Sequence, residues 1–538
     1  MVAESRHAMC GATFLNTSTT LARTIVRQIL EAGITDVVIS PGSRNAPLSI
    51  AFSQAAARNL ITLHTRIDER TAAFFALGIA KASKRPVPVL CTSGTAVANY
   101  HPAILEASHS NLPLLVMTAD RPANLRRTGA NQTTEQARIF GKAVRYFADV
   151  SGAAYPMELP FNSLRTGPVH LNIQFAEPLS PDDDTDWLAT VKKREPLVLS
   201  EKSAGTFYTK STRGILVIGQ DRAGFSVEEV NKFAKDLGWP ILAEDPLSFP
   251  EAIPHASIFL TSQSITDELA PDTVVVIGRT TLSRPINRII SMARKSIVID
   301  PRILTVDSDR SADQKFTSLP ICEKSVIDTE YLARWVKYGE RAAKMVSEIK
   351  DWSEQVLARE FSANLPTGTT LFISSSRPIR DIEGFSTPRT GIETFANRGL
   401  AGIDGNISTA LGIASQRKST VALLGDLSFL HDITGLIHHE QIDLKIYVVD
   451  NNGGGIFSTL SHRGVDGFEE IFGTPHNLDL QKIAAAFGIA TNRVSNQSEL
   501  KADLAKPVNG LSITVIEVPN REKNADNLAA IFKSIDSI

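Results

Sequence analysis

Two polar residues that follow apolar segments could together bind a divalent cation in the last third of the chain. Asp426 follows the apolar run 421–424, and Asn451 follows a second apolar run at 445–449. The spacing between them fits one helical crossover, which places both turns at the carboxyl edge of a parallel sheet, where α/β proteins bind ligands. A carboxylate, an amide oxygen and a nearby backbone carbonyl are hard ligands that suit Mg²⁺ and its bridging of phosphates.

Each of these two residues also has an ordinary structural explanation. An aspartate at the end of a strand often caps the next helix, and Asn451 opens an Asn-Asn-Gly turn. The occurrence of both residues at this spacing favours a cation site over the two separate explanations. Ser428 and the N-terminus of the helix expected after Asp426 would then supply hydrogen-bond donors to a diphosphate.

The segments that would position these residues alternate between strand and helix along the chain. Short apolar runs indicate buried strands, and the stretches between them, such as 70–83 and 95–108, indicate helices. This order implies right-handed crossovers and a parallel sheet that is covered on both faces. The expected strands are 36–40, 87–91 and 114–118 in the first third, 214–219, 274–278 and 296–300 in the middle, and 421–424, 445–449 and 511–518 in the last third.

The alternation divides into three units of similar size. An acidic segment with two prolines, residues 178–186, begins a linker after the first unit. A long amphipathic helical region at 329–361 leads into the third unit. We therefore predict an α/β protein with three doubly wound parallel-sheet domains, at residues 1–185, 205–345 and 350–538.

Composition excludes several other classes of protein. The 538 residues carry 56 basic and 58 acidic side chains, so the net charge of −2 argues against a general nucleic-acid binder. No apolar run approaches the roughly 18 residues that would span a bilayer. The 3 cysteines, Cys10, Cys91 and Cys322, lack metal-site spacing and suit a reducing compartment. Since the first residues do not resemble a secretory signal, we expect a cytoplasmic protein.

Taken together, these motifs resemble those of one family of enzymes. Gly425–Ser428 followed by Asn451-Asn452 resembles the Gly-Asp-Gly and Asn-Asn motif of thiamine diphosphate-dependent enzymes, with Leu427 at the second glycine. Gly-Asp-Leu-Ser is typical of one branch, the 2-succinyl-5-enolpyruvyl-6-hydroxy-3-cyclohexene-1-carboxylate synthases of menaquinone biosynthesis. Other segments from Thr20 to the C-terminus resemble the same branch; they are 40–44, 68–70, 92–99, 118–122, 129–132, 397–399, 402–405 and 456–457.

The resemblance implies a cofactor, thiamine diphosphate, with Mg²⁺ or alternatively Mn²⁺. In this family a glutamate hydrogen-bonds the aminopyrimidine ring and promotes loss of the C2 proton, and Glu69 matches this catalytic position. Ile403 matches the residue that props the cofactor in a bent form. The metal ligands match Asp426, Asn451 and the carbonyl of Gly453. The implied cofactor-binding set is Glu69, Ile403, Gly425, Asp426, Leu427, Ser428 and Asn451.

The resemblance also implies the reaction and its substrates. The family is a group of transferases that decarboxylate 2-oxoglutarate and add the succinyl carbanion equivalent to isochorismate. Both substrates are dianions, so their pocket needs fixed cations, preferably guanidinium groups that pair with carboxylates in a bidentate way. The matching substrate-binding positions are Ser43, Arg44, Arg121, Gln132, Arg284, Ser376, Arg380, Arg398, Ile456 and Phe457.

In the family, the pyrimidine-binding and diphosphate-binding domains that hold one cofactor belong to different subunits. The resemblance therefore implies that residues 1–185 bind the pyrimidine and residues 350–538 the diphosphate, in a homodimer or homotetramer with active sites at subunit interfaces. Two alternatives stay open. One is another thiamine diphosphate-dependent decarboxylase or carboligase, such as an acetolactate synthase. The other is a regulatory relative that has lost catalysis.

Overall fold

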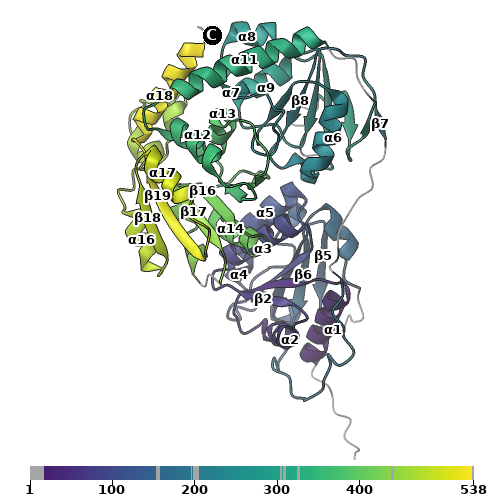
Figure 1. The fold of residues 1–538 in the computed structure, drawn as a ribbon. Helices are drawn as coiled ribbons and strands as arrows, with labels where there is room; N and C mark the ends of the chain where they lie inside the picture. Colours follow the sequence, from purple (N-terminus) through teal and green to yellow (C-terminus); the bar gives the residue numbers. More distant parts are fainter. Residues whose placement is uncertain are drawn as a thin grey trace, which may run out of the picture.

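Three α/β units follow one another in the computed structural model. The structure describes residues 17–535 except 153–157, 196, 198–204, 303–305, 307–310, 324–327 and 438–440. Figure 1 shows the N-terminal unit at the bottom in purple, the central unit at the upper right in teal, and the C-terminal unit at the left in green and yellow. Each unit contains a sheet whose strand pairs are all parallel, which confirms the predicted fold class.

The N-terminal unit is built on a six-stranded sheet in the order β2-β1-β3-β4-β6-β5. β1, β3 and β4 consist entirely of buried residues, as expected for central strands of a parallel sheet that is covered on both faces. The strands are β1 Asp36–Ile39, β2 Thr62–Thr65, β3 Val87–Cys91, β4 Leu114–Asp120, β5 Tyr146–Val150 and β6 Val169–Gln174. The helices are α1 Thr17–Glu31, α2 Ala46–Ala57, α3 Glu69–Ser83, α4 Thr95–Asn99 and α5 His101–Ser110.

The central unit has a five-stranded sheet in the order β12-β11-β10-β8-β9. Two further short strands, β7 and β13, pair with each other. The strands are β7 Thr206–Phe207, β8 Gly214–Ile218, β9 Ile241–Ala243, β10 Thr273–Ile277, β11 Lys295–Ile299, β12 Gln314–Phe316 and β13 Ile321–Cys322. The helices are α6 Val227–Leu237, α7 Ala256–Phe259, α8 Gln263–Glu268 and α9 Arg284–Met292.

The helical region predicted at 329–361 is two helices rather than one. α11 (Thr329–Glu348) ends before α12 (Glu354–Asn364) begins. The side chain of Ser353 caps α12 by accepting a hydrogen bond from the backbone N–H of Val356 at 3.3 Å. This break gives α12 its own direction and places its first residue, Glu354, beside the C-terminal sheet, where the backbone N–H of Glu354 donates to Asn524.

The C-terminal unit has a six-stranded sheet in the order β15-β14-β16-β17-β19-β18. In the pairing of β16 with β17, Gly425 lies opposite Val449, so the carboxyl ends of the two strands are adjacent. The strands are β14 Thr370–Ile373, β15 Glu393–Phe395, β16 Thr420–Gly425, β17 Leu444–Asp450, β18 Ala490–Val494 and β19 Leu511–Glu517. The helices are α13 Arg377–Phe385, α14 Asn406–Ala414, α15 Asp426–His431, α16 Leu480–Ala486, α17 Gln497–Leu504 and α18 Arg521–Ser534.

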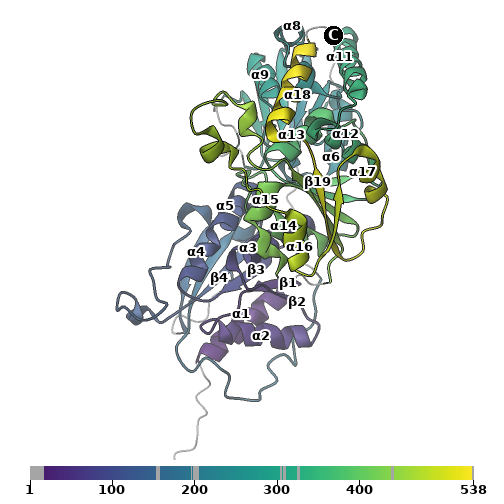
Figure 2. The ribbon, with the colours of Figure 1, turned by 90° about the vertical axis from the view of Figure 1, so that its left-hand side faces the viewer.

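Helices α3 and α14 join the N-terminal and C-terminal units (Figure 2). Their backbones approach closely at two glycines, because a Cβ at Gly78 would collide with the carbonyl of Thr409 and a Cβ at Gly412 with the carbonyl of Phe75. Buried residues of both helices belong to one apolar core that continues from the first sheet to the third. The two units are therefore held in one arrangement within the chain.

None of the described helices combines the length and the apolar character needed to cross a bilayer.

Candidate functional site

The two turns predicted to form a cation site lie side by side. Asp426 is the first residue of α15 and is only 3% exposed. Its Oδ2 accepts a hydrogen bond of 2.8 Å from the backbone N–H of Gly453, in the turn that follows β17. Its Oδ1 accepts another, of 2.7 Å, from the N–H of Leu427. The turn after β16 is thus bonded directly to the turn after β17.

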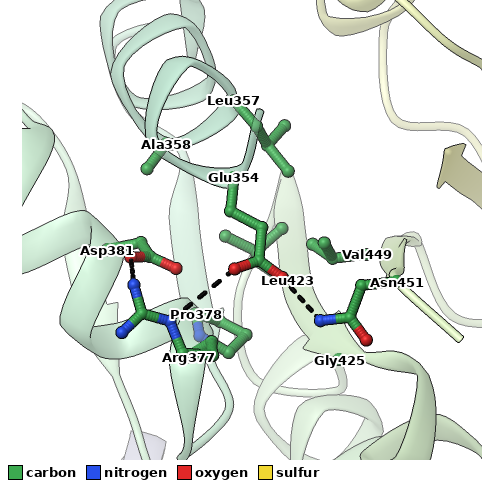
Figure 3. Close-up of a pocket in the computed structure, with 10 residues that line it drawn as sticks. All are labelled: Glu354, Leu357, Ala358, Arg377, Pro378, Asp381, Leu423, Gly425, Val449 and Asn451. Carbon is green, nitrogen blue, oxygen red and sulfur yellow. Dashed lines mark hydrogen bonds and ion pairs between the residues drawn. The ribbon is translucent and has the colours of Figure 1, made fainter. Parts of the chain in front are cut away.

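Of the two polar atoms in the Asn451 side-chain amide, one forms a hydrogen bond and the other does not. Its nitrogen donates a hydrogen bond of 2.6 Å to Oε1 of Glu354 (Figure 3). Its Oδ1 is buried and has no hydrogen-bond partner among the residues that the structure describes. Buried amide oxygens are nearly always satisfied, so an acceptor of this kind next to a carboxylate fits the binding of a cation.

The turn at residues 451–455, which we call the cation turn, is fixed by a second segment of the same unit. A Cβ at Gly453 would collide with the carbonyl of Gly473, so this position requires glycine. The N–H of Gly454 donates to the same carbonyl at 2.8 Å. Arg521 donates to the carbonyl of Asn452 at 2.7 Å and also pairs with Glu469. The backbone carbonyls of this turn are therefore held in place before any ligand binds.

Ser428 connects the turn at Asp426 to the loop that carries Ile403. The Ser428 hydroxyl donates to the carbonyl of Ile403 at 3.0 Å and accepts from the amide of Asn406 at 2.8 Å. Asn406 also donates to the carbonyl of Ile403 at 2.7 Å. The structure thus brings the C-terminal members of the predicted cofactor set together at one edge of the sheet; they are Ile403, Gly425, Asp426, Leu427, Ser428 and Asn451.

Glu69 is the first residue of α3 and comes from the N-terminal unit. The side chain of Asp68 caps this helix by accepting from the N–H groups of Arg70 and Thr71. The Glu69 side chain is half-buried and forms no hydrogen bond or ion pair with the described part of the chain. Its carboxyl group is therefore available to a ligand.

Within one chain, the neighbours of Glu69 contact the end of α15 that is remote from Asp426. Arg70 donates to the carbonyl of His431, the last residue of α15, at 2.7 Å. Asp68 accepts from the hydroxyl of Thr434, in the 3₁₀ helix Ile433–Leu436, at 2.6 Å. Asp426 begins the same helix, so Glu69 and the cation turn lie towards opposite ends of α15.

A first group of predicted substrate residues gathers around Ser93, after strands β1, β3 and β4. Arg121 donates to the Ser93 hydroxyl at 2.9 Å and to the carbonyl of Gln132 at 2.7 Å. The Gln132 amide donates to the carbonyl of Ser93 at 3.1 Å. Partial burial and the nearby Arg44 guanidinium lower the pKa of Arg121. With Ser43 and Glu69, these residues form what we call the amino-terminal half-site: Ser43, Arg44, Glu69, Arg121 and Gln132.

Arg44 is held at the edge of this group by the end of the first unit. It donates to the carbonyl of Phe175 at 3.0 Å and pairs with Glu177 at 3.2 Å. Ser43, immediately before it, is exposed. Thus the cationic groups of this half-site lie close to the surface of the chain.

A second group of predicted substrate residues lies in the C-terminal unit. Arg398 is 5% exposed and pairs with the buried Glu244 of the central unit at 3.0 Å. Arg380 donates to the carbonyl of Ser376 at 2.7 Å. Burial, together with the neighbouring Arg377 and Arg398, lowers the pKa of Arg380.

Hydrogen bonds join the segment of this second group to the turn after β16. The hydroxyl of Ser374 accepts from the N–H of Gly425 at 3.3 Å, and the hydroxyl of Ser375 donates to the carbonyl of Asn397 at 3.4 Å. We call the combined cluster the carboxyl-terminal half-site. Its residues are Ser376, Arg380, Arg398, Ile403, Gly425, Asp426, Leu427, Ser428, Asn451 and Gly453.

The remaining predicted substrate residues lie at the margins of this cluster. Arg284 is exposed in the first turn of α9, two residues after Leu282, whose N–H donates to Glu244 at 3.2 Å. Ile456 and Phe457 are half-buried beyond the cation turn, and the Phe457 ring packs against Phe472 with 5.4 Å between centroids. They provide an apolar surface next to the turn at residues 451–455.

Comparison with known proteins agrees with this division into three units. Residues 19–139 match the N-terminal TPP binding domain of thiamine pyrophosphate enzymes, 181–373 the middle domain of thiamine pyrophosphate, and 382–518 the C-terminal TPP binding domain. A 2-succinyl-5-enolpyruvyl-6-hydroxy-3-cyclohexene-1-carboxylate synthase from Nocardioides sp. (strain ATCC BAA-499 / JS614) is 41% identical, over 95% of this chain and 96% of that protein. The chain belongs to this synthase family.

A second member of the synthase family, from Thermobifida fusca (strain YX), is 37% identical over 94% of this chain and 96% of its own. Among solved structures, benzoylformate decarboxylase from Polynucleobacter necessarius has the same fold, with a TM-score of 0.65 at 16% identity, over 94% of this chain and 99% of that one. The identification of the family from its motifs is confirmed.

Sequence reasoning missed several residues that shape the synthase site. His476 lies with Nε2 3.2 Å from Oδ2 of Asp426 and 3.7 Å from Oδ1 of Asp450. The ligand atoms of these three residues all lie within 4.8 Å of one another, a spacing that three metal ligands can have. Because Nδ1 of His476 accepts from the N–H of Leu478 at 3.0 Å, Nε2 carries the proton and donates to Asp426. This arrangement makes His476 a partner of the aspartate and not a ligand.

Glu244 and Glu354 were also missed, and both are partners of residues that were predicted. Glu244 holds Arg398, and Glu354 holds Asn451. Each lies about a hundred or more positions away from its partner in the chain, and no motif surrounds it. Local spacing therefore carried no signal for either.

Proposed function

We propose that the chain catalyses thiamine diphosphate-dependent decarboxylation of 2-oxoglutarate and conjugate addition of the succinyl carbanion equivalent to isochorismate. The product would be 2-succinyl-5-enolpyruvyl-6-hydroxy-3-cyclohexene-1-carboxylate, an intermediate of menaquinone biosynthesis. The observation that carries this proposal is the 41% identity, over nearly the whole chain, to a relative that bears the name of this synthase. The two half-sites supply the groups that the reaction needs.

The carboxyl-terminal half-site fits a divalent cation of the Mg²⁺ type. Asp426 contributes a carboxylate, Asn451 an amide oxygen without a protein partner, and Gly453 a backbone carbonyl in a constrained turn. These are the oxygen ligands that Mg²⁺ prefers, and Mn²⁺ accepts the same set. Such a cation would neutralise a diphosphate, whose other oxygens would lie near Leu427 and Ser428.

When bound, thiamine diphosphate would supply a carbon that adds to the 2-oxoacid and stabilises the charge left by departing CO₂. The protein must bind, orient and protonate around that chemistry. Glu69 would hold a proton at the aminopyrimidine ring, since its carboxyl has no competing partner in the described chain. Ile403, whose carbonyl is bonded to Ser428, would support the bend between the two cofactor rings.

We further propose that one complete site combines the two half-sites of different subunits, in a homodimer or homotetramer. The resemblance to the family, in which the two domains that hold one cofactor belong to different subunits, motivates this proposal. Large apolar side chains are exposed near each half-site, with Ile67 56% exposed beside Glu69 and Ile471 62% exposed in the segment that fixes the cation turn. In the proposed assembly, the partner subunit would cover these side chains.

The cationic residues favour dicarboxylate substrates. Arg44 and Arg121 lie in one half-site and Arg380 and Arg398 in the other, so a joined site would present guanidinium groups from both sides. A pyruvate enzyme needs no second carboxylate clamp, which argues against an acetolactate synthase. Closing the site against water would favour addition to isochorismate over protonation of the decarboxylated substrate.

An assay with purified protein, 2-oxoglutarate, isochorismate and Mg²⁺, with and without thiamine diphosphate, tests the proposal. We expect the synthase product only when the cofactor is present. Turnover of pyruvate without any reaction of 2-oxoglutarate and isochorismate would select the acetolactate synthase alternative. Binding of thiamine diphosphate in calorimetry, without decarboxylation of any 2-oxoacid, would select the regulatory alternative.

A further inference from the structure

A buried ionic cluster lies directly behind the proposed cation turn, and the reaction does not use it. Glu354, Arg377 and Asp381 line a small cavity of about 30 Å³ that ends at Gly425 and Asn451. Figure 3 shows Glu354 between the guanidinium of Arg377 and the amide of Asn451, with its carboxylate oxygens directed one to each. Ion pairs are expensive to bury, so the position of this cluster calls for a reason.

We infer that Glu354 is a positioning residue for the cation site, because it holds the amide of Asn451 so that Oδ1 faces the cation. This inference rests on the proposed function, in which Asn451 is a metal ligand. Both carboxylate oxygens of Glu354 are directed to other side chains, one to Asn451 and the other to Arg377.

The chemistry of the amide makes this orientation specific. A carboxylate accepts hydrogen bonds, so it selects the NH₂ end of the Asn451 side chain and repels the oxygen end. The hydrogen bond between the two side chains is short, at 2.6 Å. Once the nitrogen is taken, Oδ1 must point away from Glu354, and it has no partner among the described residues.

Glu354 is itself fixed from three sides. As the first residue of α12, it follows the capping Ser353, and its backbone N–H donates to Asn524 at 3.0 Å. Its second carboxylate oxygen lies 3.7 Å from Nε of Arg377. Arg377 in turn pairs with Asp381, four residues further along α13. The carboxylate is thus held where it meets Asn451.

The walls of the cavity leave the amide few other choices. Leu357, Ala358, Leu423 and Val449 surround the cluster with apolar surface, and the cavity has room for about one water molecule. Without Glu354, the NH₂ group of Asn451 would be left buried without its partner, and rotation of the amide would no longer be opposed. A cation ligand would then be only partly preorganised.

A Mn²⁺ titration of the full chain at saturating thiamine diphosphate tests this inference. The EPR signal of free Mn²⁺ measures how much of the ion is bound. Glu354→Met keeps the length of the side chain but replaces the carboxylate by a thioether, which is uncharged and a much weaker hydrogen-bond acceptor. We expect it to weaken Mn²⁺ binding by roughly 10–100-fold, the usual effect of losing a residue that orients a metal ligand. Activity should return towards that of the unchanged protein at high Mn²⁺ concentration.

Two further variants keep the test decisive. Glu354→Asp retains the charge opposite Arg377 but withdraws the carboxylate from Asn451, so it should weaken Mn²⁺ binding even if Glu354→Met does not fold. Glu360→Met lies on the same helix, where Glu360 pairs with Arg359 and Lys501, and should bind Mn²⁺ normally. Unchanged Mn²⁺ affinity in a folded Glu354→Met or Glu354→Asp protein would overturn the inference. Failure of the unchanged protein to bind Mn²⁺ with thiamine diphosphate would instead overturn the proposed function beneath it.

Discussion

The two half-sites differ in how completely one chain builds them. In the carboxyl-terminal half-site, Asp426, Ser428, Asn451 and Arg398 are all buried, and each is bonded to a neighbour from another element. In the amino-terminal half-site, Ser43 and Gln132 are exposed, and Glu69 has no partner in the described chain. The first is a finished binding surface, whereas the second presents its groups outward.

This contrast has a physical explanation. A metal and diphosphate site needs rigid ligands, because misplaced oxygens lose affinity steeply. A proton-transferring acid instead needs to meet the cofactor after it has been bound, so its own chain need not enclose it. Under the proposed function, the buried half-site would anchor the cofactor, and a second subunit would complete the exposed half-site.

Among the variants considered, the largest loss of activity should come from a substitution in the amino-terminal half-site. Glu69→Gln keeps the size of the side chain but cannot exchange a proton with the aminopyrimidine ring, so turnover should fall by about 10²–10⁴-fold. Because Glu69 has no structural partner in the described chain, thermal unfolding and Mn²⁺ binding should not change. Steady-state kinetics at saturating cofactor measure the loss. Turnover close to that of the unchanged protein would remove Glu69 from this role.

Replacing one arginine in each half-site should separate effects on substrate binding from effects on stability. Arg398→Ala leaves the buried Glu244 without its partner and should lower the free energy of unfolding by roughly 3–5 kcal/mol. Arg121→Ala, closer to the surface, should change stability by less than about 1 kcal/mol while it raises the KM for the dicarboxylate substrates. Chemical denaturation and substrate titration of both variants check this. Equal destabilisation by both would show that the half-sites do not differ in this respect.

A smaller effect, on the pH dependence of stability, should come from Asp432, which follows α15. Its carboxylate accepts a hydrogen bond from the backbone N–H of Ser408 in α14. Burial raises the pKa of Asp432 to about 7. The folded state then holds a proton that the unfolded state releases near pH 4. The contribution of Asp432 to the free energy of unfolding is therefore greatest at low pH and falls as the pH rises to 7. Between pH 5 and 7 this fall should be about 2 kcal/mol.

Asp432→Asn cannot titrate and should lack this contribution. Denaturant melts of both proteins at pH 5, 6 and 7 provide the comparison, with all other carboxyl groups common to the two. Parallel pH profiles for the variant and the unchanged protein would contradict the assigned pKa.

Much of the carboxyl-terminal half-site could be predicted from the sequence, because its strands are continuous apolar runs. β16 and β17 were located to within a residue or so at each end, and their adjacency brings Asp426 to the turn that contains Asn451. Strands such as β2 and β5 were not found, since most of their residues are exposed or half-buried and show no apolar run. Their positions depend on the sheet that they extend.

The supporting residues were beyond reach for a different reason. Glu354, Glu244 and His476 act on residues that are close in space and distant in the chain, and each is a single side chain outside any motif. The break between α11 and α12, which places Glu354, depends on a cap at Ser353 that the long amphipathic pattern conceals. The spacing of a motif predicts which side chains one turn presents to a ligand. Which distant side chains hold those groups in place depends on tertiary packing.

The assembly of one site from two chains is the central claim, and mixing two inactive variants tests it most directly. Glu69→Gln lacks the acid and Asp426→Asn lacks the metal carboxylate, so each protein alone should be inactive. If the half-sites join across subunits, dissociating and reassembling an equal mixture should restore roughly a quarter of the activity of the unchanged protein, because each mixed dimer contains one intact site. A mixture that exchanges subunits but stays inactive would contradict the claim.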